Sequence, residues 1–562
     1  MLMLEKYLPR IEFSSYEEFV KDFTIKVPAV FNFAYDVVDE WARIAPQKTA
    51  LVWCDEEGRK ARFTFADLKR ESDKAANFFK GLGIGKGDPV MLILKRRYEF
   101  WFSLLALHKL GAVAIPATHL LTAKDIIYRN NAAGIKAIVA VADPRAFLSL
   151  IEDLDQAIYS HRDYPMRTRL GTTWLVSALN RYGCLATRNY QTGVFPAAAE
   201  VSGEKLASDY NRKMKGCFSC TIPCSRFFRL DADPFGGLAS EGPEFEGLAG
   251  FSSRVGNSDV ALALKAVDMC NRYGLDVITT SACISFAMEC YEKGIIGREE
   301  ADGLDLSWGH GPTILALIGK IARREGFGDV LADGTPAAAR QIGRGSEKYV
   351  MDVKGLEFFQ ADPRGIKAYG LGVAVASRGG DHCRCEPSFE FSEDAEEGMR
   401  RYGIADSAFR LAYRGKGLVV KDFEEKCVLA DALNACKNTI VNMEVLPYDL
   451  AARFLNAAVG WEMSADEVQR ACERVVNLER AFIAREGIRR EDDYLPERFL
   501  KEPLPPDSGP SAGQVIELEP MLDEYYAARG WELRTGLPTT EKLRSLGLGD
   551  VADDLIADSI QA

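Results

Sequence analysis

Three closely spaced cysteines constrain this chain more than any other feature of its sequence. Cys217, Cys220 and Cys224 follow a C-x2-C-x3-C spacing within GCFSCTIPC, a segment rich in turn-forming residues. Thiolates at this spacing can converge on one soft metal centre, either zinc or an iron–sulfur cluster. A cluster normally takes four thiolates, so the fourth must come from elsewhere in the chain. We favour a redox cluster over structural zinc and over a chance grouping among 13 cysteines.

Composition narrows the class of protein. A chain of 562 residues accommodates about three to four domains. A net charge of −12 argues against nucleic acid or an anionic membrane as a partner. The first residues lack the basic and then apolar pattern of a signal peptide, and charged residues, a glycine and a proline interrupt the longest apolar stretch, 101–121. We therefore expect a cytoplasmic protein whose cysteines serve metal or redox chemistry.

The chain has two unlike parts. Residues 35–141 alternate between strand and helix patterns, which predicts a parallel α/β sheet. Thr64 and Asp67 predict a capping box for the helix that follows. Beyond about residue 145, long segments of helical periodicity end at glycines and predict a mostly helical region. Strands are expected at 49–54, 61–65, 90–94, 112–117 and 137–141, helices at 259–274 and 281–294, and a linker or exposed loop at 500–513.

The first part resembles a known family. The segments that carry the resemblance are FNFAYDVVDEWARIAPQKTALVW, FTFADLKRESDKAANFFKGLGIGKGDPVMLIL and LLALHKLGAVAIPATHLLTAKDI. They are similar to the start of an acyl-CoA synthetase of the adenylate-forming, AMP-binding family. Adenylation needs a Thr/Ser/Gly-rich loop whose backbone N–H groups cradle phosphates. The only similar stretch begins at Gly171 and continues into Trp174 and Leu175, without the required glycine and lysine, so an AMP-forming acyl-CoA ligase is a disfavoured alternative.

From about Lys136 onward, a series of blocks resembles a second family. The blocks include KAIVAVADPRAFLSLI, LATRNYQTGVF, GCFSCTIPCSRF, GPEFEGLAGFSSRVGN, CNRYGLDVITTSACISFAMECYEKGII and VKGLEFFQADPRGIKAYGLGVAVASRGGDH. In this order they resemble the aldehyde:ferredoxin oxidoreductase family of tungsten enzymes. The two resemblances together imply a multidomain fold. An N-terminal α/β fragment of an adenylate-forming enzyme, residues 1–140, would precede two mostly α-helical domains of aldehyde ferredoxin oxidoreductase type, residues 141–370 and 371–562.

The second resemblance implies a complete cluster site. In that family the fourth thiolate comes from a late D-x-x-G-L-C block, which here runs from Asp431 to Cys436. Cys436 is therefore the expected fourth ligand, and Cys427 is the runner-up. The late block and an earlier one contact the pterin cofactor in that family. The residues carried over as pterin-binding are Asn271, Leu275, Asp276, Asp431 and Ala435.

The same resemblance implies the catalytic residues. The family places a glutamate and a histidine beside the metal, which correspond here to Glu246 and His382, with Glu244 as the alternative acid. A carboxylic acid or a histidine can move protons and polarise a carbonyl. Cys383 and Cys385, which follow His382, are expected to be free or packed thiols.

The implied activity is the oxidation of an aldehyde and water to a carboxylic acid. Electrons would pass from a tungsten or molybdenum bis-pterin to a [4Fe–4S] cluster and then to ferredoxin. In that family a separate N-terminal domain cradles the pterin, and the synthetase-like segment stands in its place here, so we expect impaired activity. A non-catalytic iron–sulfur electron-transfer module is the leading alternative. The sequence leaves the substrate, the metal and the oligomeric state open.

Overall fold

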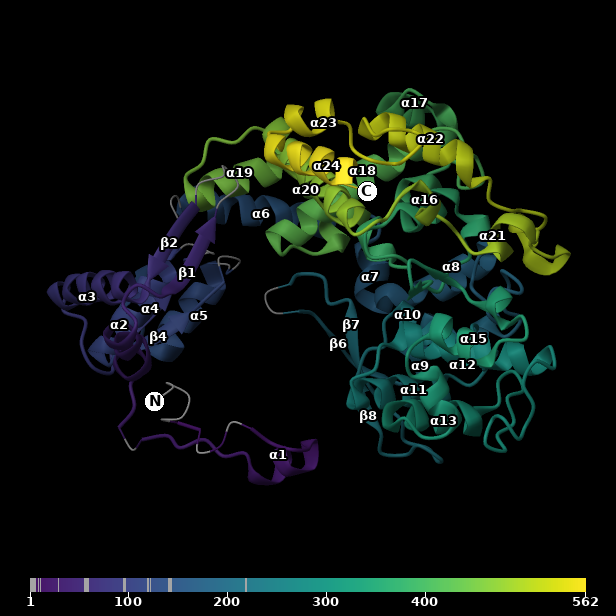
Figure 1. Ribbon diagram of the computed structural model, residues 1–562, viewed down its shortest axis with the longest axis horizontal. Helices are drawn as coiled ribbons and strands as arrows, with labels where there is room; N and C mark the ends of the chain where they lie inside the picture. The colour runs from purple at the N-terminus through teal and green to yellow at the C-terminus, as the bar shows by residue number, and fades with distance from the viewer. Residues whose placement is uncertain are drawn as a thin grey trace. The chain divides into compact units, whose positions relative to one another are not determined.

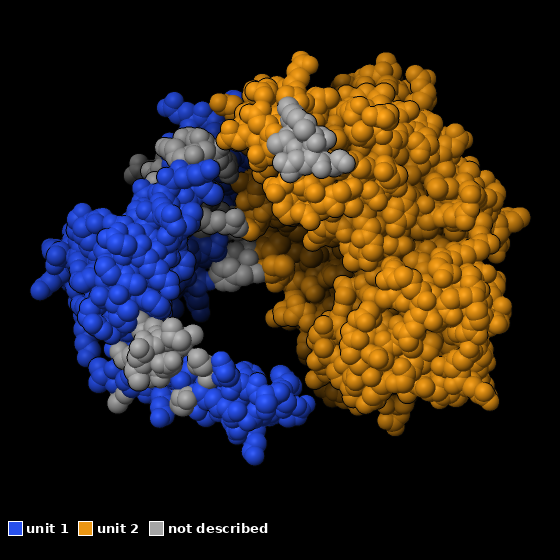
Figure 2. Space-filling view, viewed as in Figure 1, with its two compact units in different colours: residues 1–153, 450–464 blue, residues 154–449, 465–562 orange. Residues whose placement is uncertain are grey.

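The computed structural model divides the chain into two compact units. They comprise residues 1–153 with 450–464, and residues 154–449 with 465–562 (Figure 2). The structure describes residues 7–8, 10, 12–28, 30–54, 60–94, 98–118, 121, 123–139, 144–217 and 220–561. The expected strand at 137–141 therefore lies partly outside the described residues. The domain boundaries expected near residues 140 and 370 stay predictions.

The first unit contains a small parallel α/β sheet (Figure 1). Strand β3 lies between β4 and β5 and runs parallel to both. Helices α3 and α4 pack against it, with Phe79, Val90 and Leu107 buried in the shared core. The strands and helices of this unit are α1 (Tyr16–Asp22), α2 (Glu40–Ile44), β1 (Thr49–Cys54), β2 (Lys60–Thr64), α3 (Phe65–Gly81), β3 (Pro89–Leu92), α4 (Tyr98–Leu110), β4 (Val113–Pro116), α5 (Ala123–Ala133) and β5 (Ala137–Val139).

The sequence prediction for this unit is largely confirmed, with one correction. The capping box is present, because the Asp67 N–H donates to Thr64 Oγ1 at 3.2 Å and the Thr64 N–H donates to Asp67 Oδ2 at 2.9 Å. Strands β1 and β2, however, pair with each other antiparallel and form a separate two-stranded sheet. The prediction of one parallel sheet was wrong for them, because a five-residue connection can join antiparallel neighbours but not parallel ones.

The second unit is mostly helical, as the periodicity predicts. Helix α18 packs against α16, α20 and α22. The helices of this unit are α7 (Tyr164–Leu170), α8 (Leu175–Tyr182), α9 (Gly203–Asp209), α10 (Phe245–Gly250), α11 (Val260–Tyr273), α12 (Val277–Glu292), α13 (Gly311–Arg323), α14 (Phe327–Leu331), α15 (Thr335–Ile342), α16 (Lys367–Val375), α17 (Ala395–Tyr402), α18 (Lys416–Leu433), α20 (Ala465–Arg485), α21 (Glu497–Lys501), α22 (Leu518–Arg529), α23 (Thr540–Ser545) and α24 (Gly549–Gln561). Helices α6 (Pro144–Ser160) and α19 (Tyr448–Val459) each continue from one unit into the other.

Short antiparallel sheets interrupt the helices of the second unit. Strands β6 (Asn211–Lys215), β7 (Ser225–Arg229) and β8 (Ala239–Glu241) form one sheet, and β9 (Asp352–Val353) with β10 (Leu356–Glu357) form another. The connection from β6 to β7 carries the three-cysteine motif. Among the described residues, no helix combines the length and the apolar character needed to cross a membrane.

The segment 500–513 corrects the expectation of a linker, since three of its residues are buried, while seven of its 14 residues are exposed as a loop would be. Leu504 is buried, and so are Ser508 and Ser511. The Ser511 hydroxyl donates to the Tyr182 carbonyl at 2.7 Å, at the end of α8. Gly183, which ends α8 with a φ of 71°, leaves room for the Ser508 carbonyl, which would lie 1.8 Å from a Cβ at that position. Composition indicated a loop correctly but could not predict the surface that it covers.

Candidate metal centre and active site

The structure brings four cysteine thiols of the second unit together. Cys217, Cys220 and Cys224 lie between β6 and β7, and Cys436 lies just beyond α18, where Asn434 adopts a φ of 52° and ends the helix. Burial raises the pKa of Cys224 to about 12, with contributions from Glu244 and from the other three thiols. Burial also raises the pKa of Cys436, with contributions from Cys220 and Cys217. The four thiols are therefore close enough to interact electrostatically.

Cys427, the alternative fourth ligand, has other neighbours. It lies within α18 and is fully buried. Burial raises its pKa, and its electrostatic partners are Glu386, Lys437 and Asp431. The structure thus places Cys436, and not Cys427, with the three clustered cysteines.

The spacing of the thiols differs from that of the ligands of a single zinc ion. Zinc binds sulfur at about 2.3 Å, so tetrahedral geometry puts neighbouring sulfurs about 3.8 Å apart. Among the described residues, no three of these four sulfur atoms lie within 4.8 Å of one another. In an iron–sulfur cluster each thiolate binds a different iron, which requires wider spacing.

The surroundings of the thiols also fit a cluster. Ile158, Ile222 and Met443 form a buried apolar group that packs against Cys220 and Cys224. Backbone N–H groups donate to two of the sulfurs: Ile222 to Cys220 Sγ and Asn438 to Cys436 Sγ, each at 3.4 Å. Hydrogen bonds to sulfur are one of the features by which proteins set the potential of such clusters. Cys220 and Cys224 are partly buried, while Cys217 and Cys436 are exposed.

Glu246 and His382 meet in the same unit. Glu246 lies in the first turn of α10, and His382 begins a short 3-10 turn, His382–Arg384. His382 Nε2 lies 3.8 Å from Glu246 Oε1, and both side chains are mostly buried. The Gln360 N–H holds the other carboxylate oxygen of Glu246 at 2.8 Å, and the ring of Phe359 stacks on the imidazole at 5.1 Å.

Burial and charge perturb both members of this pair. Burial raises the pKa of Glu246, against the opposing charge of His382. Burial lowers the pKa of His382, but Glu246 and the Cys383 thiol outweigh it and raise the pKa to about 10. His382 is therefore a cation at neutral pH. The pair places a hydrogen-bond donor and a carboxyl group side by side.

Glu244, the alternative acid, points to other partners. Its carboxylate accepts a hydrogen bond from Thr172 Oγ1 at 2.6 Å, and its charge acts on Cys224. The two glutamates therefore face different centres, Glu246 facing His382 and Glu244 facing the thiols.

The residues expected to bind pterin lie at helix ends. Asp276 caps α12, accepting the Thr279 N–H at 2.7 Å, and its charge contributes to the raised pKa of Glu246. Asn271 is exposed in the last turn of α11, and Leu275 is half-buried. Asp431 is half-exposed at the end of α18 and pairs with Arg384 and Lys437, while Ala435 precedes Cys436 in the chain.

Cys383 and Cys385 differ from each other. Cys383 Sγ lies 3.7 Å from His382 Nε2. With Asp381 and His382 it forms a group of ligating atoms that all lie within 4.8 Å of one another. Cys385 is buried, and its thiol donates to the Val420 carbonyl at 3.7 Å.

Sequence reasoning missed the residues that join the two centres. Glu386 follows His382 by four positions, and its charge acts both on His382 and on Cys436. Arg167, buried on α7, contacts the Cys436 side of the thiols through Asn438. Arg167 lies on a short helix that also carries Arg169, and Glu386 lies outside the helices, so neither residue stands out from its neighbours in the sequence.

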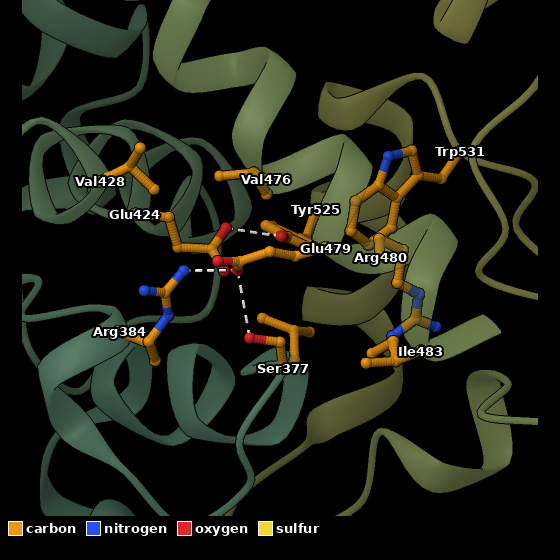
Figure 3. A pocket seen from close by; sticks show the side chains of 11 residues that line it. Ser377, Arg384, Glu424, Val428, Val476, Glu479, Arg480, Ile483, Tyr525 and Trp531 are labelled. Carbon is orange, nitrogen blue, oxygen red and sulfur yellow. Dashed lines mark hydrogen bonds and ion pairs between the residues drawn. The ribbon is translucent and has the colours of Figure 1, made fainter. Parts of the chain in front are cut away.

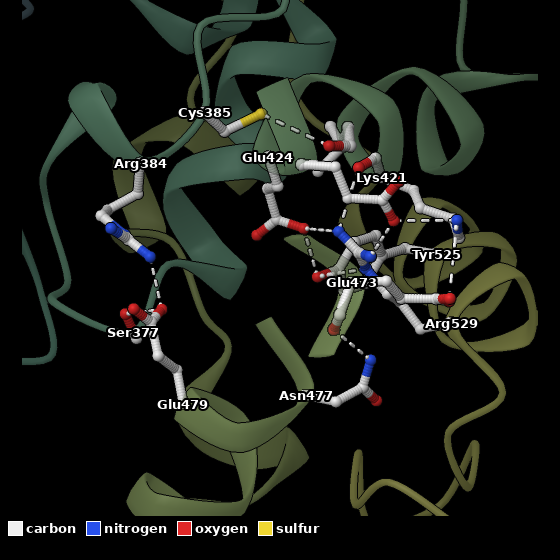
Figure 4. Close-up of polar contacts among 12 residues, drawn as sticks. Ser377, Arg384, Cys385, Lys421, Glu424, Glu473, Asn477, Glu479, Tyr525 and Arg529 are labelled. Carbon is white, nitrogen blue, oxygen red and sulfur yellow. Dashed lines mark hydrogen bonds and ion pairs between the residues drawn. The ribbon is translucent and has the colours of Figure 1, made fainter. Parts of the chain in front are cut away.

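A small cavity lies beside Arg384 and is lined by residues of α18, α20 and α22 (Figure 3). It measures about 20 Å³ and is lined by Arg384, Glu424, Glu479, Tyr525 and Trp531, among others. That volume holds about one water molecule. Figure 4 shows the polar contacts beside it, in which Arg529 pairs with Glu424 while Arg384 and Ser377 both contact Glu479. None of the predicted site residues lines this cavity, so we assign it no substrate.

Comparisons with known proteins match the two parts of the chain to different families. The family described as aldehyde ferredoxin oxidoreductase, domains 2 and 3, matches residues 149–548, and the family described as AMP-binding enzyme matches residues 38–178. The tungsten-containing aldehyde ferredoxin oxidoreductase of Pyrococcus furiosus is 35% identical over 427 residues, which cover 73% of this chain and 65% of the relative. That of Thermococcus kodakarensis is 34% identical over 421 residues, with the same coverage. The chain thus spans about two thirds of the length of these relatives.

Two further similarities concern one part of the chain and the fold. The mitochondrial acyl-coenzyme A synthetase ACSM5 of Rattus norvegicus is 40% identical over 119 residues, 20% of this chain and 21% of the relative. A solved structure, the active site complex BamBC of benzoyl coenzyme A reductase, matches with a TM-score of 0.57 and 20% identity. It covers 82% of this chain and 71% of its own, and it supports the fold alone.

Proposed function

The chain belongs to the aldehyde ferredoxin oxidoreductase family, and from this premise we propose that it is a redox protein that oxidises an aldehyde to a carboxylic acid. Its electrons would leave through a [4Fe–4S] cluster to ferredoxin. The observation that carries the proposal is the convergence of Cys217, Cys220, Cys224 and Cys436 in the unit that also joins Glu246 to His382.

The four thiols would hold the cluster. Their mutual electrostatic interaction, the apolar group beside Cys220 and Cys224 and the two N–H donors to sulfur support this assignment. Burial raises the pKa of Cys220 and of Cys436. Loading would therefore release protons, since thiolates and not thiols bind iron.

The second cofactor would be a tungsten or molybdenum bis-pterin. The residues proposed to contact it are Asn271, Leu275, Asp276, Asp431 and Ala435, at the C-terminal ends of α11 and α18 and at the start of α12. Short polar side chains and unpaired backbone groups at helix ends suit the many N–H groups of a pterin. The partly buried His382 supports a neighbouring group, because its Nδ1 is buried and has no hydrogen-bond partner among the described residues. When bound, the metal would accept the electron pair of the aldehyde C–H bond.

The side chains of this site would handle the aldehyde and the protons. The reaction converts RCHO and H2O into RCOOH, two protons and two electrons. The cationic His382 would donate a hydrogen bond to the carbonyl oxygen and favour attack on the carbon. Glu246 would take a proton from the attacking water, and its raised pKa brings its basicity closer to that required at neutral pH.

The proximity of the two centres supports electron transfer between them. Glu386 lies four residues from His382 and acts electrostatically on Cys436. A short segment thus connects the substrate side to the cluster side within one unit. Electrons released at the first centre would reach the second without leaving this unit.

Metal analysis of anaerobically purified full-length protein tests the proposal. We expect about four iron atoms per chain, with tungsten or molybdenum, and aldehyde-dependent reduction of ferredoxin. Iron without tungsten or molybdenum and without aldehyde oxidation would favour a non-catalytic electron-transfer module. The absence of iron would refute both assignments.

The synthetase-like segment supports a second candidate only weakly. Residues 38–178 match an AMP-binding enzyme, but the sequence provides no phosphate-binding loop. Gly171 begins a 3-10 turn that ends at Trp174, and Thr172 is engaged with Glu244. Carboxylate-dependent exchange of pyrophosphate into ATP would revive acyl-CoA ligase activity, and its absence would agree with our assignment.

A further inference from the structure

Arg167 is a buried cation beside the proposed cluster. It lies on α7 and is 7% exposed. Its Nη1 donates to Asn438 Oδ1 at 2.5 Å, and the Asn438 N–H in turn donates to Cys436 Sγ at 3.4 Å. The guanidinium is therefore two hydrogen bonds from a cluster ligand.

The negatively charged groups around this cation pair with it only weakly. Asp163 Oδ2 lies 4.0 Å from Arg167 Nη2, which is the limit of an ion pair, and Asp163 is partly exposed. Arg167 Nε is buried without a hydrogen-bond partner among the described residues. Burial lowers the pKa of Arg167, and the charges of Asp163, Glu386, Tyr369 and Cys436 oppose this. A buried charge is costly unless an opposite charge lies nearby, and a cluster with four thiolates would supply that charge.

Arg226 is a second buried arginine near the thiols, but its surroundings differ. Its guanidinium donates to the Thr173 hydroxyl at 2.8 Å and to the Leu170 carbonyl. Glu244 and Cys224 supply its opposing charge. Arg226 Nε, like Arg167 Nε, is buried without a hydrogen-bond partner among the described residues. Of these two arginines, Arg167 is the one that reaches a thiol through a hydrogen-bonded intermediate, Asn438.

We propose that Arg167 sets the reduction potential of the cluster, with its charge favouring the reduced state. The inference rests on the proposed function, because it requires the cluster to be present. Reduction adds one electron to the cluster, and oxidation by an external acceptor removes it again. Arg167 keeps its proton throughout and exchanges no electron. It acts through its charge and through Asn438, so it is a positioning and tuning residue.

The proposal predicts the direction of the effect. A positive charge stabilises an added electron by Coulomb attraction. Replacing Arg167 by a neutral residue should lower the ratio of reduced to oxidised cluster about tenfold at a fixed solution potential. For a one-electron couple this is a shift of about 59 mV to more negative potential.

Redox titration followed by electron paramagnetic resonance on the anaerobic full-length protein tests this. Two neutral variants, Arg167→Gln and Arg167→Met, should both lower the midpoint potential, so that either one suffices if the other does not fold. Arg167→Lys should keep it close to wild type. Arg410→Gln is the control, because Arg410 is equally buried but contacts the Gly365 carbonyl and Ser511 Oγ. The midpoint potential of the cluster in Arg410→Gln should equal that in the wild type.

The outcomes separate the two claims. An unchanged midpoint potential in a neutral Arg167 variant that retains its cluster would overturn the tuning role. A shift in Arg167→Lys as large as in Arg167→Gln would also overturn it, because charge would then not be the cause. Absence of iron and of a cluster signal in the wild type would overturn the proposed function itself.

Discussion

The Glu246–His382 pair gives the sharpest prediction, through Glu246→Gln. His382 Nε2 and Glu246 Oε1 are 3.8 Å apart. At an effective dielectric constant of about 20, unit charges at that distance interact by roughly 4 kcal/mol, which equals about three pKa units. Because Glu246 is the main cause of the raised pKa of His382, about 10, the substitution should lower that pKa to about 7.

Nuclear magnetic resonance of histidine-labelled protein measures this directly. The chain has only five histidines, and His382→Gln identifies the signal of His382. Glu244→Gln is the matched control, since Glu244 is engaged with Thr172, and it should leave the pKa of His382 unchanged. A wild-type pKa near 6.5, or an unchanged pKa in Glu246→Gln, would refute the coupling.

The same pair predicts a dependence of stability on pH. The pKa of His382 is raised in the folded protein, so its contribution is fully present below the unfolded value of about 6.5. It is lost as the pH rises through the folded value of about 10. Between pH 7 and pH 10 the wild type should therefore lose more thermal stability than Glu246→Gln. An equal loss in both proteins would contradict the assignment.

Three further predictions concern the cluster site and the fold. Cys436→Ser should abolish most of the iron content while Cys427→Ser retains it, because Cys436 interacts with the other three thiols; equal iron content in the two variants, measured by metal analysis, would contradict this. Gly183→Ala should lower the melting temperature more than Gly274→Ala. Both glycines have a φ of 71° and share a backbone cost of about 1 kcal/mol, but only at Gly183 would the new Cβ lie 1.8 Å from a carbonyl oxygen. Equal melting temperatures of the two variants would contradict the packing argument. Asp276→Ala should destabilise the protein by about 1 kcal/mol through loss of the α12 cap, and urea unfolding that matches the wild type would speak against the cap.

Much of the local structure could be predicted from the sequence. The strands β1 to β4, the Thr64 capping box and the helix ended by Gly274 follow from periodicity and from residues at the ends of elements. These signals lie within a few residues of what they specify. The pairing of β1 with β2 was missed because a strand pattern does not name its partner.

The candidate site was less accessible to sequence reasoning. Spacing alone placed three thiols together, but Cys436 lies more than two hundred residues away and entered through the family resemblance. The pairing of Glu246 with His382 entered in the same way. Neither Glu386 nor Arg167 belongs to a sequence motif, because the role of each depends on the groups beside it in the folded protein.

The sequence by itself determined the two unlike parts of this protein and its family, and its thiol spacing predicts the ligand chemistry. Thiol spacing, apolar periodicity and helix caps act over a few residues, so they can be read along the chain. Only the tertiary structure decided that Cys436 rather than Cys427 joins the other thiols, that Glu246 rather than Glu244 faces His382, and that Arg167 lies buried beside the site. Each of these choices depends on distance and on burial, since electrostatic energy grows as two groups approach and lose water. Chain folding sets both quantities across hundreds of residues.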